Sequence, residues 1–314
     1  MVATAVAAPS LRTTQPWRFR LDTDSRTVHI HAAADRARRH TDQVGRASHL
    51  SEGCAVLNLR VVAVHFGREP VTRPLPCPDR PALLATVRLA ESVRDAPETG
   101  LYETVWRRHS SRSPLSGRPL PSDLLTELIE AAHLGGATMR FSGRHDTERE
   151  LCATWEVEWR NRADTDRSAQ SRRLVSGPHS PSLGLPSAAL GPQDALDPLP
   201  IRNLGAHRHP EVLPARAFEP RPLLALPSAA HDRRTDWPRA GQALDRVLLL
   251  ATRRAVRASL LHQAMEWPDL RRALDGLPVD GPRGHTQMVL RLGYGPRGPA
   301  SPRRPVEETT ADHK

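Results

Sequence analysis

Apolar residues recur at the spacing of helical turns in two long stretches of the chain, and both stretches predict helices. The first begins near Ser122, a suitable N-cap residue, carries apolar side chains from Leu124 to Ala132, and ends at Gly135-Gly136. The second runs from about residue 238 to residue 256 and is apolar over much of its surface. A helix of that kind packs on several sides, so we expect it to be central and buried.

Shorter runs predict strands. Residues 28–31 alternate between apolar and polar side chains, and residues 18–21 also have the character of a strand. Residues 288–292 form a third candidate, which would leave its sheet through Gly293-Tyr294-Gly295-Pro296. Strands mixed with longer helices are typical of an α+β fold, which is the class we expect here.

Three weak matches recur in the same order in the two halves of the chain. Ala-Ala pairs precede Arg-Phe pairs at residues 7–19 and 131–141, and the helical stretch 50–66 resembles the one that contains Gly241. Residues 85–90 likewise resemble residues 288–293. A shared order favours two tandem, degenerate repeats. We assign residues 1–95 to a truncated first repeat and residues 96–314 to the second.

The spacing between matched positions predicts an insertion in the second repeat. Phe19 and Gly53 are 34 residues apart, whereas Phe141 and Gly241 are 100 apart, a difference of 66 residues. Within this interval, residues 178–227 contain eleven prolines, which rules out regular secondary structure throughout. Long segments of this composition in compact proteins are lids, binding loops or disordered. We place a Pro-rich, lid-like insertion at about residues 160–222.

The charge of the chain invites a nucleic-acid interpretation that its pattern does not support. The net charge is +10, but Lys314 is the only lysine, and the arginines are spread along the chain among acidic residues. No basic tail and no basic stretch with interspersed aromatic residues is present. We therefore expect no nucleic-acid partner.

Composition also bears on the compartment. No run of about 18 apolar residues predicts a membrane span, and no signal peptide is evident at the N-terminus. Cys54, Cys77 and Cys152 show neither a CxxC pattern nor the spacing of a metal site. We expect reduced thiols in a cytoplasmic protein that has no membrane partner.

A polar loop punctuated by prolines lies between the Ala-rich N-terminus and the first predicted strand. The loop contains Pro9, Ser10, Thr13 and Gln15, and ends at Pro16-Trp17. Two prolines restrict its backbone, and its short polar side chains favour turns. A rigid loop of this kind suits the edge of a flat ligand that forms hydrogen bonds, such as an isoalloxazine ring. The other interpretation is an ordinary helix-to-strand loop whose tryptophan packs in the core.

Two arginine clusters are candidates for binding phosphate. Arg107, Arg108 and Arg112 lie within six residues that also hold Ser110 and Ser111, and Arg303-Arg304 follows the last predicted strand. Arginine offers phosphate oxygens a bidentate fork of donors. Each cluster alone could be a solvated surface group, but one phosphate commonly draws arginines from separate segments. A polar turn around Ser259 and His262 is a further candidate for contact with a ligand.

Other motifs give little support for a dinucleotide site, a metal site or a hydrolase. Residues 293–298 match G-x-G-x-x-G, but the prolines that follow prevent the helix that a dinucleotide site requires. The pairs His29/His31 and His207/His209 lack further ligands at the usual spacing, so we expect no metal site. No G-x-S-x-G or P-loop pattern supports a hydrolase or a nucleoside triphosphatase.

Taken together, these segments resemble the Acg family of FMN-binding proteins, in the nitroreductase superfamily. The resemblance rests on the proline loop, the segment that begins at Arg107, residues 236–244, 263–268 and 287–296, and the end of the chain. It weakens over residues 145–230. The resemblance implies a nitroreductase-like fold in which two repeats mimic a homodimer, with central helices flanked by mixed sheets, and a chain that is monomeric.

The resemblance also implies site residues and a cofactor, FMN. The phosphate would be held by Arg107, Arg108, Arg112 and Arg304, with Ser110 bonding phosphate or ribityl oxygens. The ring would contact the following residues: Pro9, Ser10, Thr13, Gln15 and, from the other side, Ser259. Thr13 departs from the Asn of the superfamily loop, and a hydroxyl cannot replace both groups of an amide. In the second repeat, residues 133–139 stand where the proline loop would be and lack its pattern. One site should therefore be intact and the other degenerate, so we expect one FMN per chain.

The function implied is that of an FMN-dependent oxidoreductase of nitroreductase type. Electrons from NAD(P)H would pass through FMN to a nitro compound or a quinone, and no protein side chain needs to act as a catalytic acid or base. The alternative is a catalytically silent protein that binds or sequesters FMN beneath the inserted lid, in connection with stress or dormancy. Reduction of the flavin by a nicotinamide distinguishes the two.

Overall fold

The architecture was determined from a computed structural model of the 314-residue chain. The structure describes residues 1–33, 36, 42, 44–91, 96–172, 175–176, 185–186, 190–196, 199, 214–275 and 284–310. The pair His207/His209 and much of the Pro-rich segment lie outside these residues, so the expectations placed on them stay predictions.

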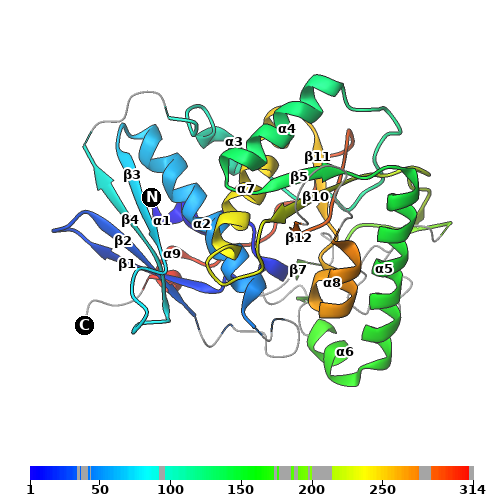
Figure 1. Ribbon diagram of the computed structural model, residues 1–314, viewed down its shortest axis with the longest axis horizontal. Helices are drawn as coiled ribbons and strands as arrows, with labels where there is room; N and C mark the ends of the chain where they lie inside the picture. The colour runs from blue at the N-terminus through cyan, green and yellow to red at the C-terminus, as the bar shows by residue number, and fades with distance from the viewer. Residues whose placement is uncertain are drawn as a thin grey trace.

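Helices and strands alternate along the chain (Figure 1). The helices are α1 (Val2–Val6), α2 (Arg46–His65), α3 (Tyr102–Arg107), α4 (Ser122–Leu134), α5 (Arg144–Ala163), α6 (Thr165–Arg172), α7 (Trp237–Arg253), α8 (Pro268–Leu274) and α9 (Val306–Thr309). The longer strands are β1 (Trp17–Asp22), β2 (Thr27–Ala32), β3 (Glu69–Pro74), β4 (Leu83–Ala90), β5 (Thr138–Phe141), β10 (Leu223–Ala229), β11 (Arg257–Leu260) and β13 (Leu290–Gly293). Two-residue strands are β6 (Val175–Ser176), β7 (Leu185–Pro186), β8 (Gln193–Asp194), β9 (Ala215–Arg216) and β12 (His285–Thr286).

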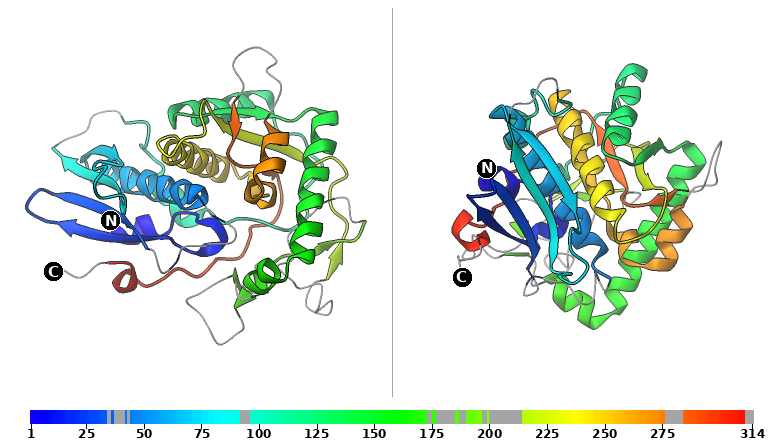
Figure 2. Two further views of the ribbon diagram at one scale, coloured as in Figure 1. Left: turned by 60° about the horizontal axis from the view of Figure 1, so that its bottom comes forward. Right: turned by 60° about the vertical axis from the view of Figure 1, so that its left-hand side comes forward.

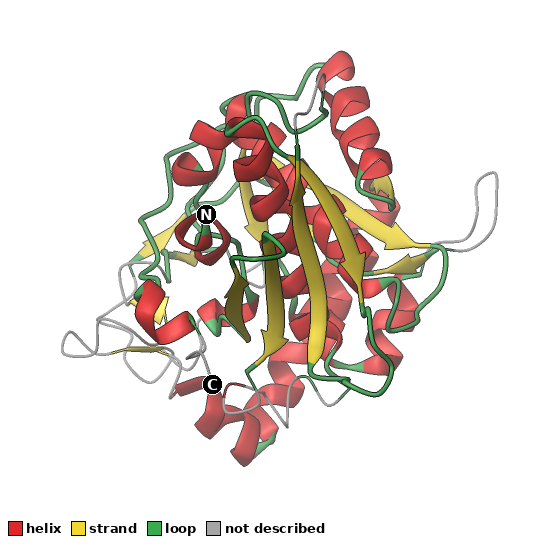
Figure 3. Ribbon diagram, turned by 90° about the vertical axis from the view of Figure 1, so that its left-hand side faces the viewer, coloured by secondary structure: helices red, strands yellow, loops and turns green. Residues whose placement is uncertain are grey.

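The strands form two principal sheets on either side of central helices, which confirms the α+β class (Figures 1 and 3). One sheet has the order β1-β2-β4-β3, and the other has the order β11-β13-β10-β12, with β5 paired to β10. Every pair in these two sheets is antiparallel, so the expectation of mixed sheets is wrong for both. The parallel pairs β6-β7 and β8-β9 are confined to the two-residue strands.

The two sheets match each other strand for strand. The order β1-β2-β4-β3 in the first corresponds to β5-β10-β13-β11 in the second. The long helices correspond as well, because α2 connects β2 to β3 and α7 connects β10 to β11. The three segment pairs noted in the sequence fall on equivalent elements: α1 with α4, α2 with α7, and β4 with β13. This arrangement is what two tandem repeats would produce, although a common origin of the halves stays a prediction.

Helices α2 and α7 pack directly against each other at a pair of glycines. A Cβ atom on Gly53 would lie 2.1 Å from the carbonyl oxygen of Pro238, and one on Gly241 would lie 2.1 Å from that of Leu50. Each glycine thus meets the backbone three residues before the other glycine. This reciprocal contact requires that neither position carry a side chain, since no Cβ atom fits at such distances.

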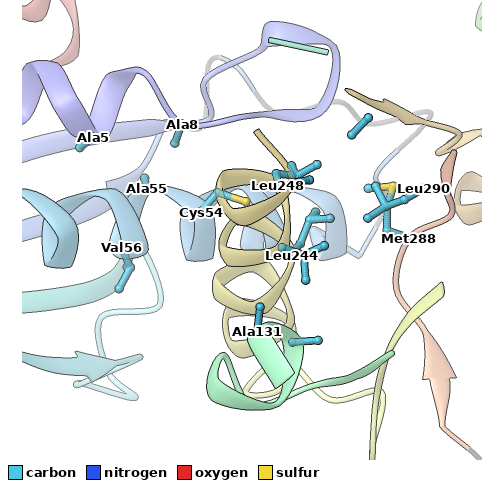
Figure 4. Packing of buried hydrophobic residues seen from close by; sticks show 14 of the residues in the cluster. Ala5, Ala8, Cys54, Ala55, Val56, Ala131, Leu244, Leu248, Met288 and Leu290 are labelled. Carbon is cyan, nitrogen blue, oxygen red and sulfur yellow. The ribbon is translucent and has the colours of Figure 1, made fainter. Parts of the chain in front are cut away.

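The core is built around this helix pair (Figure 4). Cys54, Ala55 and Val56 of α2 share one cluster of buried residues with Leu244 and Leu248 of α7, and the same cluster reaches both sheets. Residues 46–63 of α2 are buried almost without interruption, as are most residues of α7. The expectation of a central, buried α7 is confirmed, and its apolar surface on several sides explains why.

The extra chain of the second half leaves the sheet between β5 and β10. In the first half, four residues connect β1 to β2, whereas residues 142–222 separate β5 from β10 although these strands pair directly. The first part of this segment is helical and forms α5 and α6, which stand beside the second sheet (Figure 1). This segment is longer at its N-terminal end than the insertion predicted from the sequence, which spans about residues 160–222.

The C-terminal segment crosses from the second sheet to the first half of the chain (Figure 2). Thr310 forms a parallel bridge with Phe19 of β1, and the carbonyl oxygen of Glu308 accepts a hydrogen bond from Arg36. The backbone N–H of Arg304 donates to the side chain of Gln15 at 3.2 Å. These contacts fix residues 301–304 against the loop that follows α1.

Candidate functional site

A cavity of about 320 Å³ opens between the two halves of the chain. Its walls come from the proline loop, the N-terminal half of α2, residues 108–112, the end of β11, the segment around α8 and residues 301–303. Leu244, Leu260 and Met288 supply apolar surface, and Arg46, Arg108, Arg112, Arg167, Arg271 and Arg303 supply positive charge. Asp42 and Glu266 are the acidic residues among its lining.

The proline loop is held in a strained conformation. Thr13 and Gln15 have φ angles of +59° and +47°, which side chains with a Cβ atom rarely adopt. Hydrogen bonds compensate, since Ser10 Oγ accepts from the Gln15 N–H at 3.0 Å and Ser51 Oγ accepts from the Leu11 N–H at 3.2 Å. The loop thereby presents Pro9, Ser10 and Thr13 to the cavity. Strained backbone of this kind gathers at functional sites.

The segment that follows α3 is fixed between β11 and the C-terminal segment. The Ser111 N–H donates to the carbonyl oxygen of Ala258 at 2.9 Å, and a Cβ atom on Gly298 would lie 2.0 Å from the carbonyl oxygen of Ser110. Held from both sides, the segment directs Arg108, Ser110 and Arg112 into the cavity. Arg107 is exposed in the last turn of α3 and does not line the cavity.

Arg108 and Arg303 converge at one end of the cavity. Both donate to the carbonyl oxygen of Ala7, at 3.5 and 3.4 Å, although they lie almost 200 residues apart. Burial lowers the pKa of Arg303 to about 9, which leaves this guanidinium protonated at neutral pH, and burial also lowers the pKa of Arg108. The Nε of Arg303 is buried and has no hydrogen-bond partner among the described residues. This end therefore offers a positive charge and an unused donor.

A buried carboxyl group lies behind these two arginines. Asp245 of α7 is fully buried, and neither of its oxygens has a hydrogen-bond partner in the described part of the chain. Burial raises its pKa to about 7, against the opposing effect of Arg108, Arg246 and Arg303. The same burial raises the pKa of the Cys54 thiol well above its ordinary value. Asp245 is thus a group whose charge changes near neutral pH beside the cationic end.

The opposite end of the cavity carries a second group of charged and aromatic side chains. Arg46 is 6% exposed and donates from Nη1 to the backbone and side-chain oxygens of Gln287, at 2.9 and 3.0 Å. The guanidinium of Arg167 stacks over the indole ring of Trp267 at 4.2 Å. Arg271 is held by a bidentate pair with Asp232. The segment that contains α6 thus contributes Arg167 to the cavity wall.

The inserted segment also approaches the cationic end. A Cβ atom on Gly191 would lie 2.7 Å from the Cβ of Arg112, and Gly191 has a φ of +75°. The described residues of the insertion therefore contact Arg112 and supply Arg167 to the cavity wall. The remainder of the expected lid lies outside the described residues.

Comparison with known proteins finds relatives that match the chain over nearly its whole length. No known family model matches the chain. The chain is 28% identical over 311 residues to "Putative NAD(P)H nitroreductase Rv3131" of Mycobacterium tuberculosis, covering 97% of this chain and 88% of that protein. It is 26% identical over 318 residues to "Putative NAD(P)H nitroreductase acg" of the same organism, covering 98% of this chain and 93% of that protein.

The chain resembles the Acg proteins over nearly its whole length. The resemblance inferred from the motifs is thereby confirmed. A solved structure, the FMN-dependent nitroreductase NfnB from Mycobacterium smegmatis in complex with NADPH, is 13% identical, with a TM-score of 0.41, and covers 68% of this chain and 100% of that chain.

Six of the ten site residues implied by the Acg resemblance line the cavity: Pro9, Ser10, Thr13, Arg108, Ser110 and Arg112. Four do not. Arg107 faces away, Gln15 is buried and holds the backbone of Arg304, and the side chain of Arg304 pairs with Glu308 at 3.2 Å. Ser259 is buried within β11, and its neighbours Leu260 and His262 line the cavity instead.

Arg303 lines the cavity in place of Arg304. Two adjacent residues of an extended segment face opposite sides, so the sequence located the segment but not the side chain that faces inward. His262, which the sequence indicated as part of a polar turn beside a ligand, also lines the cavity, whereas Arg46, Arg167 and Arg271 were not singled out. They come from separate elements, and no local spacing connects them.

In the second half of the chain, the position equivalent to the cavity is occupied by protein. The loop between α4 and β5 packs onto α7, where a Cβ atom on Gly135 would lie 2.2 Å from the Cα of Ala243. The proline loop reaches α2 through the hydrogen bond to Ser51 and leaves the cavity beside it, whereas this loop makes direct backbone contact with α7. The contact leaves no room for a planar ligand between the loop and α7.

The described residues contain no group of three or more histidine, cysteine or acidic side chains that could hold a metal ion. Among the same residues, no helix is both long and apolar enough to cross a membrane.

Proposed function

We propose that this chain is an FMN-dependent oxidoreductase of nitroreductase type that takes electrons from NAD(P)H. The observation that carries the proposal is the convergence of Arg108 and Arg303 at one end of a cavity whose other walls include the proline loop. The names of the Acg-like relatives, which describe NAD(P)H nitroreductases, support the same assignment.

The cationic end fits the phosphate of FMN. Arg108, Arg112 and Arg303 present guanidinium groups to it, and the Nε of Arg303 is a buried donor with no partner among the described residues. A phosphate there would supply the missing acceptor and compensate buried positive charge, and charge-assisted hydrogen bonds of this kind are among the strongest in proteins. Ser110 and Ser301 also line the cavity and can add hydroxyl donors.

The proline loop and the apolar wall fit a flat ring. Pro9, Ser10 and Thr13 lie on one side of the cavity, and Leu244 and Leu260 belong to the opposite half of the chain. The loop is rigid because its strained backbone is held by Ser51 of α2. A preformed wall loses little entropy when a planar ring binds against it.

Bound FMN would supply the redox chemistry, through which electrons from the nicotinamide reach an electron-poor acceptor such as a nitro compound or a quinone. The side chains bind and orient, and the arginines around the cavity raise the electrostatic potential that a negatively charged flavin experiences. No side chain is assigned as a general acid or base, since the proposed reaction needs none from the protein.

The experiment that tests this proposal is anaerobic addition of NADH or NADPH to the purified, flavin-loaded protein. The proposal predicts that the flavin absorbance band bleaches within minutes and that a nitro compound or quinone then restores it. A band that persists under both nicotinamides contradicts the oxidoreductase proposal and favours sequestration of the cofactor. Protein that carries no flavin and binds none on addition contradicts both.

A further inference from the structure

The end of the cavity that includes Arg46 is distinct from the end proposed for phosphate. Arg46 and Cys54 are eight residues apart on α2, a distance of roughly 12 Å along the helix axis. Cys54 interacts electrostatically with Arg108, whereas Arg46 interacts with Arg271. The cavity therefore extends along α2 from one arginine cluster to another.

Most charges at the Arg46 end already have partners. Arg271 is committed to Asp232, and the carboxylate of Asp42 accepts from the backbone N–H groups of Ala47 and Ser48, at 2.9 and 2.8 Å. Glu266 lies 3.7 Å from Arg167. These carboxylates still act on Arg46 electrostatically, but each is already engaged by another donor.

Arg46 itself has no such partner. No carboxylate of the described residues lies within ion-pair distance of its guanidinium, and the hydrogen bonds of Nη1 go to neutral oxygens of Gln287. A buried charge without a direct ion-pair partner is costly, and a ligand that supplies one stabilises it. Although burial lowers its pKa to about 10, the group remains protonated at neutral pH.

An aromatic wall stands beside this charge. Trp267 lines the cavity together with Met265, Pro268 and Met288, and the Nε1 of its indole is buried without a partner in the described part of the chain. Arg167 stacks on the indole, and its buried Nη1, which lies 3.7 Å from Glu266, forms no hydrogen bond to a described residue. Apolar surface and unused guanidinium donors therefore adjoin each other.

We propose that this end of the cavity, the Arg46 subsite, binds the carboxylate of a planar aromatic electron acceptor, with Arg46 and Arg167 as its recognition residues. The inference rests on the proposed function in taking the ligand to be the acceptor. Arginine suits this role because its planar fork matches a carboxylate in two parallel hydrogen bonds. A neutral analogue of the same shape leaves these donors without a charged acceptor.

The test compares p-nitrobenzoate with p-nitrobenzamide, which are close in shape and differ in charge. Calorimetric titration of the oxidised, flavin-loaded protein should give an affinity for the benzoate about tenfold or more above that for the benzamide, the range that charge-assisted hydrogen bonds allow. Arg46→Gln and Arg167→Gln should each lower the affinity for the benzoate and leave that for the benzamide unchanged. The second variant keeps the test decisive if the buried Arg46 is needed for folding.

Arg160 provides the matched control. It also stacks on Trp267, at 5.2 Å, but it lies outside the cavity lining and is paired with Glu156 and Asp269. Arg160→Gln should therefore retain the full preference for the benzoate. If Arg160→Gln lowers the affinity for the benzoate as much as Arg167→Gln does, the indole rather than a cavity charge governs binding. That result would overturn the proposal.

The outcomes separate this inference from the proposed function. Flavin content is measured first by absorbance, and a chain without flavin contradicts the proposed function. Calorimetry detects the benzoate whether or not flavin is bound. Equal affinities for the two compounds, or no binding of the benzoate at all, therefore overturn the Arg46 subsite even where the flavin is present and reducible.

Discussion

Single residues in and beside the cavity carry charges and backbone angles that depart from the ordinary, and Asp245 is one of them. It is an acidic side chain on a helix that the sequence correctly indicates to be buried. Its position beneath Arg108 and Arg303 follows only from the approach of α3 and of the C-terminal segment. Local patterns in α7 therefore could not reveal it.

The carboxyl of Asp245 should make stability depend on pH. An unfolded chain ionises this group near its ordinary pKa of 3.8, whereas the folded chain resists ionisation until about pH 7. A raised pKa in the folded state means that rising pH costs stability between about 4 and 7, with no further cost above that range. Relative to wild type, Asp245→Asn should thus gain stability across this interval, as measured by thermal melting. A difference between the two proteins that is constant from pH 4 to pH 8 would contradict this account.

Thr13 should be replaceable to advantage. A β-branched residue is strained at a φ of +59°, whereas Asn tolerates this region. Thr13→Asn should raise the melting temperature, by an amount equivalent to about 1 kcal/mol of relieved strain. The matched control is Thr14→Asn, because Thr14 has an ordinary φ of −69° and its hydroxyl bonds Leu11. An equal or larger gain in the control would show that backbone strain at Thr13 is not the cause.

Among the elements, the crossing of α2 and α7 positions the site. The cavity follows α2, while α7 contributes Leu244 to its wall and Asp245 behind it from the second half of the chain. The sequence predicted both helices, since each has long apolar runs. It also paired Gly53 with Gly241, but it could not show that these glycines touch, because that contact depends on how two distant helices cross.

Alanine at this crossing should be strongly destabilising. Gly53→Ala places a methyl group 2.1 Å from the carbonyl oxygen of Pro238, so the helices must separate. The cost should reach about 1–3 kcal/mol or more in the free energy of unfolding, measured by urea denaturation. Gly117→Ala is the control, since nothing lies within 4 Å of its added Cβ, and it should stay within about 0.5 kcal/mol of wild type. Equal effects of the two substitutions would refute the close crossing.

On the scale of the whole molecule, the chain has the organisation of two matched halves with one intact cavity. The sequence predicted several parts of this organisation: the helices, the α+β class, the proline loop and the arginine segments. The path of the C-terminal segment was not predictable, because residues 294–304 lack a periodic pattern, and their position depends on contacts with Gln15 and Ala7. The choice of Arg303 over Arg304 follows from that path.

The cavity beside the proline loop has no equivalent at the matching position in the described part of the second half, which predicts one flavin per chain. The loop that contains Gly135 fills the equivalent position in the second half. Absorbance of the flavin released by denaturation, set against protein concentration, should give a ratio near one, and light scattering should report a monomer of 34.7 kDa. A dimer with two flavins per chain would contradict the organisation proposed here.

The central claim is that the cavity binds FMN with its phosphate at Arg108 and Arg303. The most direct test measures the affinities of FMN and riboflavin, which differ only in the phosphate, for wild type, Arg303→Ala and Arg304→Ala. We expect wild type to bind FMN about 100-fold or more tightly than riboflavin. Arg303→Ala should weaken FMN about tenfold and leave riboflavin unchanged, whereas Arg304→Ala should change neither. Equal affinities of wild type for the two flavins would contradict the account. So would a weaker affinity for FMN in Arg304→Ala but not in Arg303→Ala.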